Sequence, residues 1–270
     1  MLRTDGAQVP GGCPIESPAG NFLFTARNPG TGIDIYVNQR DSTSSVFEPG
    51  SALPAPANDA GANDFCPTPR PDGELYFVST RAGTCGSADI HHAINHPATG
   101  WNVPTNLGCE PHGPNTPGTE FSPSILETRW GTFLFFSTDY HTGNQDIYVS
   151  EMRDDGTFGP GKRLGYPINT EYNDQQPNVS QNGREIVFAS DRPSSPDDTS
   201  GFDVYYGKRH ALFRSWRRVT NLSETVPFDS VEAGETRPSL SFDGKRLYYG
   251  SGGVWISERI RHSWIERRNK

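Results

Sequence analysis

Short apolar runs alternate with polar, turn-forming segments along the whole chain, and these runs recur at a nearly constant spacing. A proline opens each repeat, with gaps of 53, 56, 54 and 61 residues between Pro14, Pro67, Pro123, Pro177 and Pro238. A glycine follows six residues after the proline in four copies and eight residues after it in the third. Asp-Gly or Asn-Gly precedes the next apolar run in three copies, and that pair is a strong signal for a β-hairpin.

Each repeat contains further apolar runs that predict strands. After the glycine, strands rich in aromatic and branched residues are expected over Asn21–Thr25, Glu74–Val78, Thr132–Ser137, Glu185–Ser190 and Arg246–Gly250. A third strand begins with an aspartate in four copies, at Asp34, Asp89, Asp146 and Asp203, and the fifth copy has Gly253-Val254-Trp255 instead. A weaker fourth strand is marked by one aromatic residue in each copy: Phe47, Trp101, Phe158, Trp216 and Trp264.

Four strands repeated five times are typical of blades around a channel. We therefore predict an all-β fold, a five-bladed β-propeller of four-stranded antiparallel blades, in one domain spanning residues 1–270. The blades cover approximately residues 13–57, 58–111, 112–168, 169–226 and 227–268. A solenoid is the alternative, but its repeats are usually shorter and its ends need polar caps. The first and last copies deviate most, so closure of the ring involves either the segment around Trp264 or a strand from Ala7-Gln8-Val9.

The recurring text has a specific form: Pro-x-x-Ser-x-x-Gly, an apolar strand ending in Phe-x-Ser-(Asp/Thr)-Arg, then Asp-Ile-Tyr. The copy between Tyr166 and Tyr206 matches it best, through Ser190-Asp191-Arg192. This text resembles the TolB-like propeller repeats, also called WD40-like or PD40 repeats. The resemblance implies the propeller fold and an exported location in bacteria, but no single chemistry. We expect a periplasmic or secreted protein whose leader is absent from this chain. Because Met1–Pro10 lacks the apolar core of a secretory signal, a cytoplasmic location is the alternative.

Composition and charge limit the classes of partner that this chain is expected to bind. The net charge of −8 disfavours nucleic acid, whose phosphates an acidic surface repels. No apolar run approaches the ~18 residues of a membrane span, and we expect a monomer. Four cysteines occur without CxxC spacing, which disfavours a zinc knuckle and allows either free thiols or two disulfides. The preferred pair is Cys85–Cys109 in the second blade, and Cys13 and Cys66 fall on adjacent inner strands.

A carboxylate stands three residues before the repeated proline in four copies, at Asp64, Glu120, Asp174 and Glu235. In a propeller these positions open the innermost strands, so they predict an acidic ring at one mouth of the channel. One interpretation is structural: each carboxylate accepts N–H groups of the turn that starts its strand. The other is functional, because clustered carboxylates bind a divalent cation such as calcium or magnesium, or crowding raises one pKa and makes an acid or base.

Four further residues are candidates for ligand binding. Arg237 and Gln176 directly precede the repeated prolines, and Arg237 either neutralises the acidic ring or pairs with an anionic ligand. His112 and His141 lie in loops that differ between copies, where a unique ligand would find asymmetry. The aspartates that open the third strands are interpreted as structural, because a residue repeated in register with every blade ties a loop to a strand.

Two functions remain open at this point. The first is a binding module that recognises a protein segment or a saccharide at the acidic mouth of the channel. The alternative is a metal-assisted hydrolase or lyase, which acts on a carbohydrate-like substrate through Asp64, Glu120, Asp174 and Glu235. The chain has no Gly-x-Ser-x-Gly motif, which disfavours the peptidases and esterases that carry accessory propellers.

Overall fold

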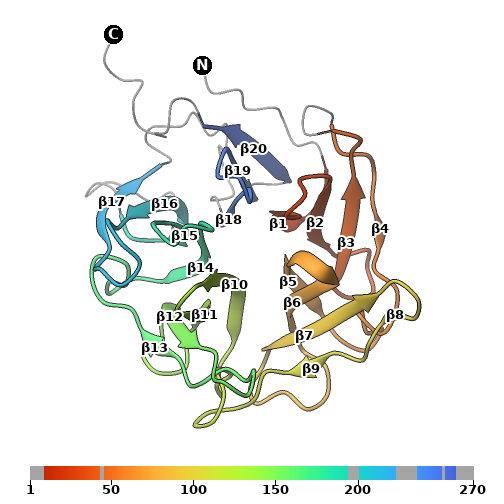
Figure 1. The fold of residues 1–270 in the computed structure, drawn as a ribbon, viewed down its shortest axis with the longest axis horizontal. Helices are drawn as coiled ribbons and strands as arrows, with labels where there is room; N and C mark the ends of the chain where they lie inside the picture. The colour runs from red at the N-terminus through yellow and green to blue at the C-terminus, as the bar shows by residue number, and fades with distance from the viewer. Residues whose placement is uncertain (1–8, 43–45, 194–200, 223–235, 251–252, 260–270) are drawn as a thin grey trace.

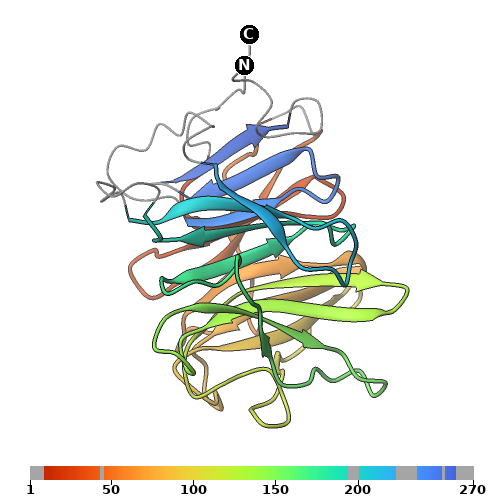
Figure 2. The ribbon, with the colours of Figure 1, turned by 90° about the vertical axis from the view of Figure 1, so that its left-hand side faces the viewer.

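The computed structural model describes residues 9–42, 46–193, 201–222, 236–250 and 253–259. They form five antiparallel sheets arranged around a central axis, with the first strand of each sheet innermost (Figure 1). Viewed from the side, the sheets follow one another around the ring (Figure 2). The five-bladed β-propeller predicted from the repeat is therefore confirmed.

Blade 1 contains β1 (Gly12–Glu16), β2 (Phe22–Arg27), β3 (Asp34–Gln39) and β4 (Ser51–Ala52). Blade 2 contains β5 (Asp64–Pro69), η1 (Pro71–Gly73), β6 (Glu74–Ser79), β7 (Asp89–His96), β8 (Gly100–Trp101) and β9 (Thr105–Asn106). Blade 3 contains β10 (Glu120–Thr128), β11 (Gly131–Thr138), β12 (Asp146–Glu151) and β13 (Lys162–Arg163). Blade 4 contains β14 (Asp174–Val179), β15 (Glu185–Ser190), β16 (Asp203–Lys208) and β17 (Arg217–Asn221). Blade 5 contains β18 (Thr236–Leu240), β19 (Arg246–Gly250) and β20 (Val254–Glu258).

The inner strands share one backbone irregularity, which explains the repeated proline. The residue before each proline has φ between +47° and +57°, a left-handed conformation that is uncommon for residues other than glycine; these residues are Cys13, Cys66, Ser122, Gln176 and Arg237. The register of every inner pair shifts at the same place, as in a β-bulge. The five prolines that follow line a central cavity of only about 20 Å³. Prolines equivalent in sequence are thus equivalent around the axis.

Apolar clusters hold neighbouring blades together all the way around the ring. Blades 3 and 4, for example, share a cluster that includes Leu126, Phe135, Phe188 and Trp216. The junction of blades 5 and 1 buries Val9 among side chains of β2, β19 and β20, and the Val254 N–H donates to the Val9 carbonyl at 3.2 Å. Val9 therefore takes part in closing the ring, whereas Ala7, Gln8 and Trp264 lie outside the described residues.

Both cysteine pairs form disulfides. Cys13–Cys66 joins the inner strands of blades 1 and 2 across 53 residues of sequence, and Cys85–Cys109 closes a 24-residue segment of blade 2. The preferred pairing of Cys85 with Cys109 is confirmed. Cross-links between distant residues stabilise a fold mainly by restricting the unfolded chain. The first pair also links two blades that pack directly against each other through apolar side chains.

Three of the four aspartates that open the third strands have the structural role expected of them. Asp89 accepts hydrogen bonds from the Cys85 and Gly86 N–H groups, Asp146 pairs with Arg163, and Asp203 accepts from the Asn221 amide. Each bond ties the loop or the outer strand of a blade to its third strand. Within the described part of the chain, no helix has the length and apolar character to cross a membrane.

Candidate functional site

The carboxylates predicted at the channel mouth are buried and engaged in their own turns. Asp64 and Asp174 are fully buried at the first positions of β5 and β14. Asp64 accepts the Asp59 N–H at 2.7 Å and pairs with Arg81 at 2.8 Å. Asp174 accepts the Thr170 N–H at 2.6 Å and pairs with the guanidinium of Arg192. Buried charges persist where such partners compensate them, so these two groups serve first as turn anchors.

Glu120 occupies the same position in blade 3 but has no arginine partner. It is fully buried at the start of β10, and the N–H and hydroxyl of Thr116 both donate to its Oε1. Its Oε2 has no hydrogen-bond partner. The residue that corresponds to Arg81 and Arg192 is Tyr140. Burial raises the pKa of the Glu120 carboxyl to about 8, although the bonds from Thr116 oppose the shift. Glu120 is therefore mainly protonated at neutral pH.

The remaining site residues predicted from the sequence do not converge on one place. Arg237 lies in the central cavity next to Gln176, whose Oε1 accepts the Arg237 backbone N–H at 3.0 Å. His141 is exposed at the rim of blade 3 and contacts Glu110 at 3.1 Å, and His112 is exposed nearby. Glu235 lies outside the described residues, so the four-carboxylate ring remains a prediction. Among the residues that are described, no three His, Cys, Asp or Glu side chains form a group that could hold a metal ion.

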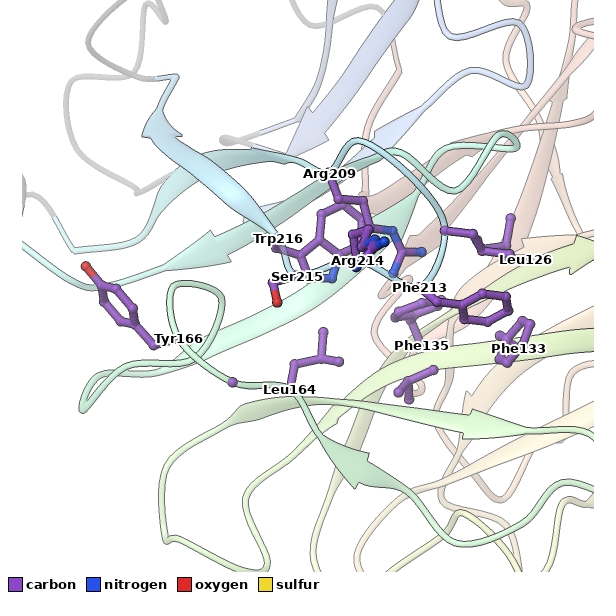
Figure 3. Close-up of a pocket in the computed structure, with 13 residues that line it drawn as sticks. Leu126, Phe133, Phe135, Leu164, Tyr166, Arg209, Phe213, Arg214, Ser215 and Trp216 are labelled. Atoms are coloured by element: carbon purple, nitrogen blue, oxygen red, sulfur yellow. The ribbon is translucent and has the colours of Figure 1, made fainter.

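A groove between blades 3 and 4 provides a much larger cavity, of about 370 Å³. The inner strands run from the channel-mouth loops to the opposite face, and the groove opens there, beyond the ends of β10 and β16. Its walls come from strands β10, β11 and β12, from the link that follows β13, and from the loop between β16 and β17 (Figure 3). The side chains that define it are Phe133, Phe135, Arg209, Phe213, Arg214 and Trp216.

Aromatic rings dominate the rim of this groove. Phe213 is 65% exposed and lies edge-on to Trp130 at 5.7 Å and to Phe133 at 5.9 Å between ring centroids. Trp130 is 55% exposed, and Tyr166 at the other end is 84% exposed. Trp216 is buried in the wall beneath Arg209, whose guanidinium lies 4.2 Å from the ring centroid. Large aromatic surfaces left exposed around a concavity are typical of binding sites.

The groove is built by a longer hairpin in blade 3 and by the inner turn of blade 4. In blade 3 the repeated glycine comes two residues late, and the longer hairpin between β10 and β11 carries Trp130 to Phe213. In blade 4 the Asn182-Gly183 turn lies beneath the groove, and a Cβ on Gly183 would approach Leu212 Cδ1 to 2.4 Å. This groove was not predicted from the sequence. The late glycine and the run from Arg209 to Trp216, which mixes arginines with aromatics, were the available signals.

Comparisons with known proteins identify the fold and leave the family open. No family model and no curated protein matches the chain. Among solved structures, the catalytic domain of a GH62 α-L-arabinofuranosidase from Coprinopsis cinerea aligns with a TM-score of 0.65 and 12% identity over 95% of this chain and 96% of that one. An α-L-arabinofuranosidase from Podospora anserina, solved in complex with cellotriose, aligns with a TM-score of 0.63 and 13% identity over 95% and 93%.

TolB from Acinetobacter baumannii also aligns, with 16% identity over 91% of this chain and 53% of that one, but its TM-score is 0.48. That similarity is too low to support the TolB-like resemblance of the repeats. The structures with higher TM-scores quoted above are carbohydrate hydrolases, and at such low identity they establish a shared architecture alone. The chain is a five-bladed β-propeller whose overall arrangement is similar to that of these two α-L-arabinofuranosidases.

Proposed function

We propose that this propeller binds saccharides, and that it does so in the groove between blades 3 and 4. The observation that carries the proposal is the set of exposed aromatic rings around a cavity of about 370 Å³. Sugar rings present apolar C–H faces that pack against aromatic rings, while their hydroxyls bond to polar groups at the rim. Arg209, Arg214 and Ser215 supply such groups here.

Two further points favour the groove over the channel mouth. The central cavity holds only about 20 Å³, too little for a sugar ring. The carboxylates expected at the mouth are occupied by their own turns, as Asp64 and Asp174 illustrate. Carbohydrate-acting proteins of the same architecture lend support to a saccharide ligand over a protein segment, since the Podospora anserina structure contains cellotriose.

Removal of the central rim aromatic tests the proposal. In Phe213→Ala we expect affinity for the best ligand in a panel of neutral and acidic trisaccharides to fall at least tenfold, because aromatic anchors of binding sites commonly contribute 2 kcal/mol or more. Isothermal titration calorimetry measures the affinity. Quenching of tryptophan fluorescence is a second readout, because Trp130 and Trp216 are two of the five tryptophans and border the groove.

The matched control is Tyr172→Ala. Tyr172 is 37% exposed, precedes β14 and therefore lies on the channel-mouth side, away from the groove. Affinity should be unchanged in this variant. The reverse result, with binding lost in Tyr172→Ala and kept in Phe213→Ala, would return the ligand to the mouth of the channel and exclude the groove.

Glycoside hydrolysis is a second candidate, and one observation favours it. Cleavage of a glycosidic bond needs a carboxyl that is protonated at the working pH, and Glu120 has a pKa of about 8. An assay with arabinan and with nitrophenyl α-L-arabinofuranoside decides the matter. If turnover is found, Glu120→Gln should abolish it, and turnover that survives the substitution would exclude Glu120 as the proton donor.

A further inference from the structure

Arg209 is partly buried and differs from most other partly buried arginines in the described part of the chain, although Arg237 in the central cavity likewise has no ion pair there. Arg40, Arg81, Arg192 and Arg246 each pair with a carboxylate. Arg209 makes no ion pair with any described residue; its Nε donates to the Gly183 carbonyl, and its ring-facing side covers Trp216. Desolvation alone lowers the pKa of this guanidinium to about 10.

An arginine held in this way has unused binding capacity. Its Nη atoms donate to no described group, and the guanidinium lies over the Trp216 ring. Taking a cation out of water without a counter-ion is unfavourable, and perturbed groups of this kind cluster at functional sites. A planar guanidinium offers paired N–H donors that match the two oxygens of a carboxylate or sulfate.

The surroundings of Arg209 strengthen the case for an anion. Arg214 lines the same cavity, so two guanidinium groups border it (Figure 3). Not one of the thirteen residues that line the cavity is an aspartate or a glutamate. The groove is therefore a cationic site on a chain whose net charge is −8. A random surface of this acidic protein would have the opposite sign.

We infer that the groove binds an acidic saccharide, whose carboxylate or sulfate group pairs with Arg209 while a sugar ring packs against Phe213. The inference rests on the proposed function, because it names the class of sugar that the same groove takes. Arg209 provides the charge recognition and Phe213 the apolar contact, so the two groups discriminate different parts of one ligand.

The groove also has room for more than one sugar unit. A second hollow of about 500 Å³ shares Phe133 and Val149 with the first and continues along blade 3 past Arg153 and Lys162. Two adjoining hollows suit a short chain better than a monosaccharide. Arg153 and Lys162 add positive charge along this path, although Glu151 and Asp154 offset it, so Arg209 remains the main determinant of charge preference.

Three trisaccharides, one neutral and two anionic, test the inference. Trimannuronate carries carboxylates where neutral β-1,4-mannotriose carries hydroxymethyl groups, and mannotriose sulfated at O6 separates the two kinds of anion. In titration calorimetry at low salt we expect the wild-type protein to bind one of the two anionic sugars at least tenfold more tightly than mannotriose. In Arg209→Gln this preference should fall to about threefold or less.

Two more variants test whether the charge preference depends on the paired donors of Arg209 and on its position in the groove. Arg209→Lys keeps the charge but loses the paired donors, so its preference should be intermediate. Arg217→Gln removes an exposed arginine of β17 that does not line the cavity, and it should behave as wild type. Thermal melting of each variant confirms that the blade is folded.

The outcomes separate this inference from the proposed function. Equal affinity for the neutral and anionic sugars in the wild-type protein, or an unchanged preference in Arg209→Gln, would overturn the acidic-saccharide inference and leave saccharide binding standing. Failure of the wild-type protein to bind any sugar of the panel would overturn both.

Discussion

Replacement of Arg192 by methionine is expected to destabilise the protein by about 3–5 kcal/mol, the range found when one partner of a buried ion pair is removed. Asp174 has no exposed surface, and in this variant its negative charge would stay buried without a cation. Arg192 also donates to the carbonyls of Pro167 and Ile168 in the link between blades 3 and 4. Its loss therefore leaves both a buried charge and unpaired backbone acceptors.

The double variant Arg192→Met with Asp174→Asn separates these two causes. Because it removes the buried charge as well, we expect it to recover at least half of the lost stability in urea denaturation. Lys245→Met is the control: its ammonium is exposed and pairs with exposed Asp243, and such pairs contribute at most about 1 kcal/mol. A loss below 1 kcal/mol in Arg192→Met alone would show that the pair is not a determinant of stability.

The fold was predictable because the repeat specifies it locally. Each Asp-Gly or Asn-Gly turn sets a hairpin, and the proline marks the bulged inner strand, so the second strands β6, β15 and β19 begin where the sequence places them. The preferred disulfide between Cys85 and Cys109 joins two segments of the same blade. The fourth strands were harder, because β4 and β13 have only two residues each and carry little periodicity.

The functional site was less predictable, for two physical reasons. Repetition predicted an acidic ring, yet Asp64 and Asp174 are repeated because their turns are repeated, with an arginine two residues after the second strand to neutralise each. The groove depends on side chains from neighbouring blades, and Phe213 meets Trp130 only after both blades have packed. A contact between residues 83 positions apart produces no local sequence pattern. The two segments that carry Trp130 and Phe213 could be noticed only as deviations from the repeat.

Unlike Asp64 and Asp174, Glu120 is buried without an arginine partner. We therefore expect its replacement by glutamine to change how stability depends on pH. Burial raises the pKa of this carboxyl from 4.5 in the unfolded chain to about 8 in the fold. A raised pKa in the fold contributes stability that is complete below pH 4.5 and declines as pH rises to about 8, because the unfolded chain releases the proton first. The decline approaches roughly 1.4 kcal/mol per pH unit.

The wild-type protein should therefore lose about 3 kcal/mol relative to Glu120→Gln between pH 5 and pH 8, since glutamine keeps the acceptor for Thr116 and has no proton to release. Urea denaturation of both proteins at pH 5, 6.5 and 8 measures this difference. Glu171→Gln, at an exposed carboxylate, should run parallel to wild type across the same range. A constant difference between wild type and Glu120→Gln would mean that Glu120 is ionised in the fold. That result would remove the observation favouring hydrolysis while leaving the groove, which contains no titratable carboxyl, unaffected.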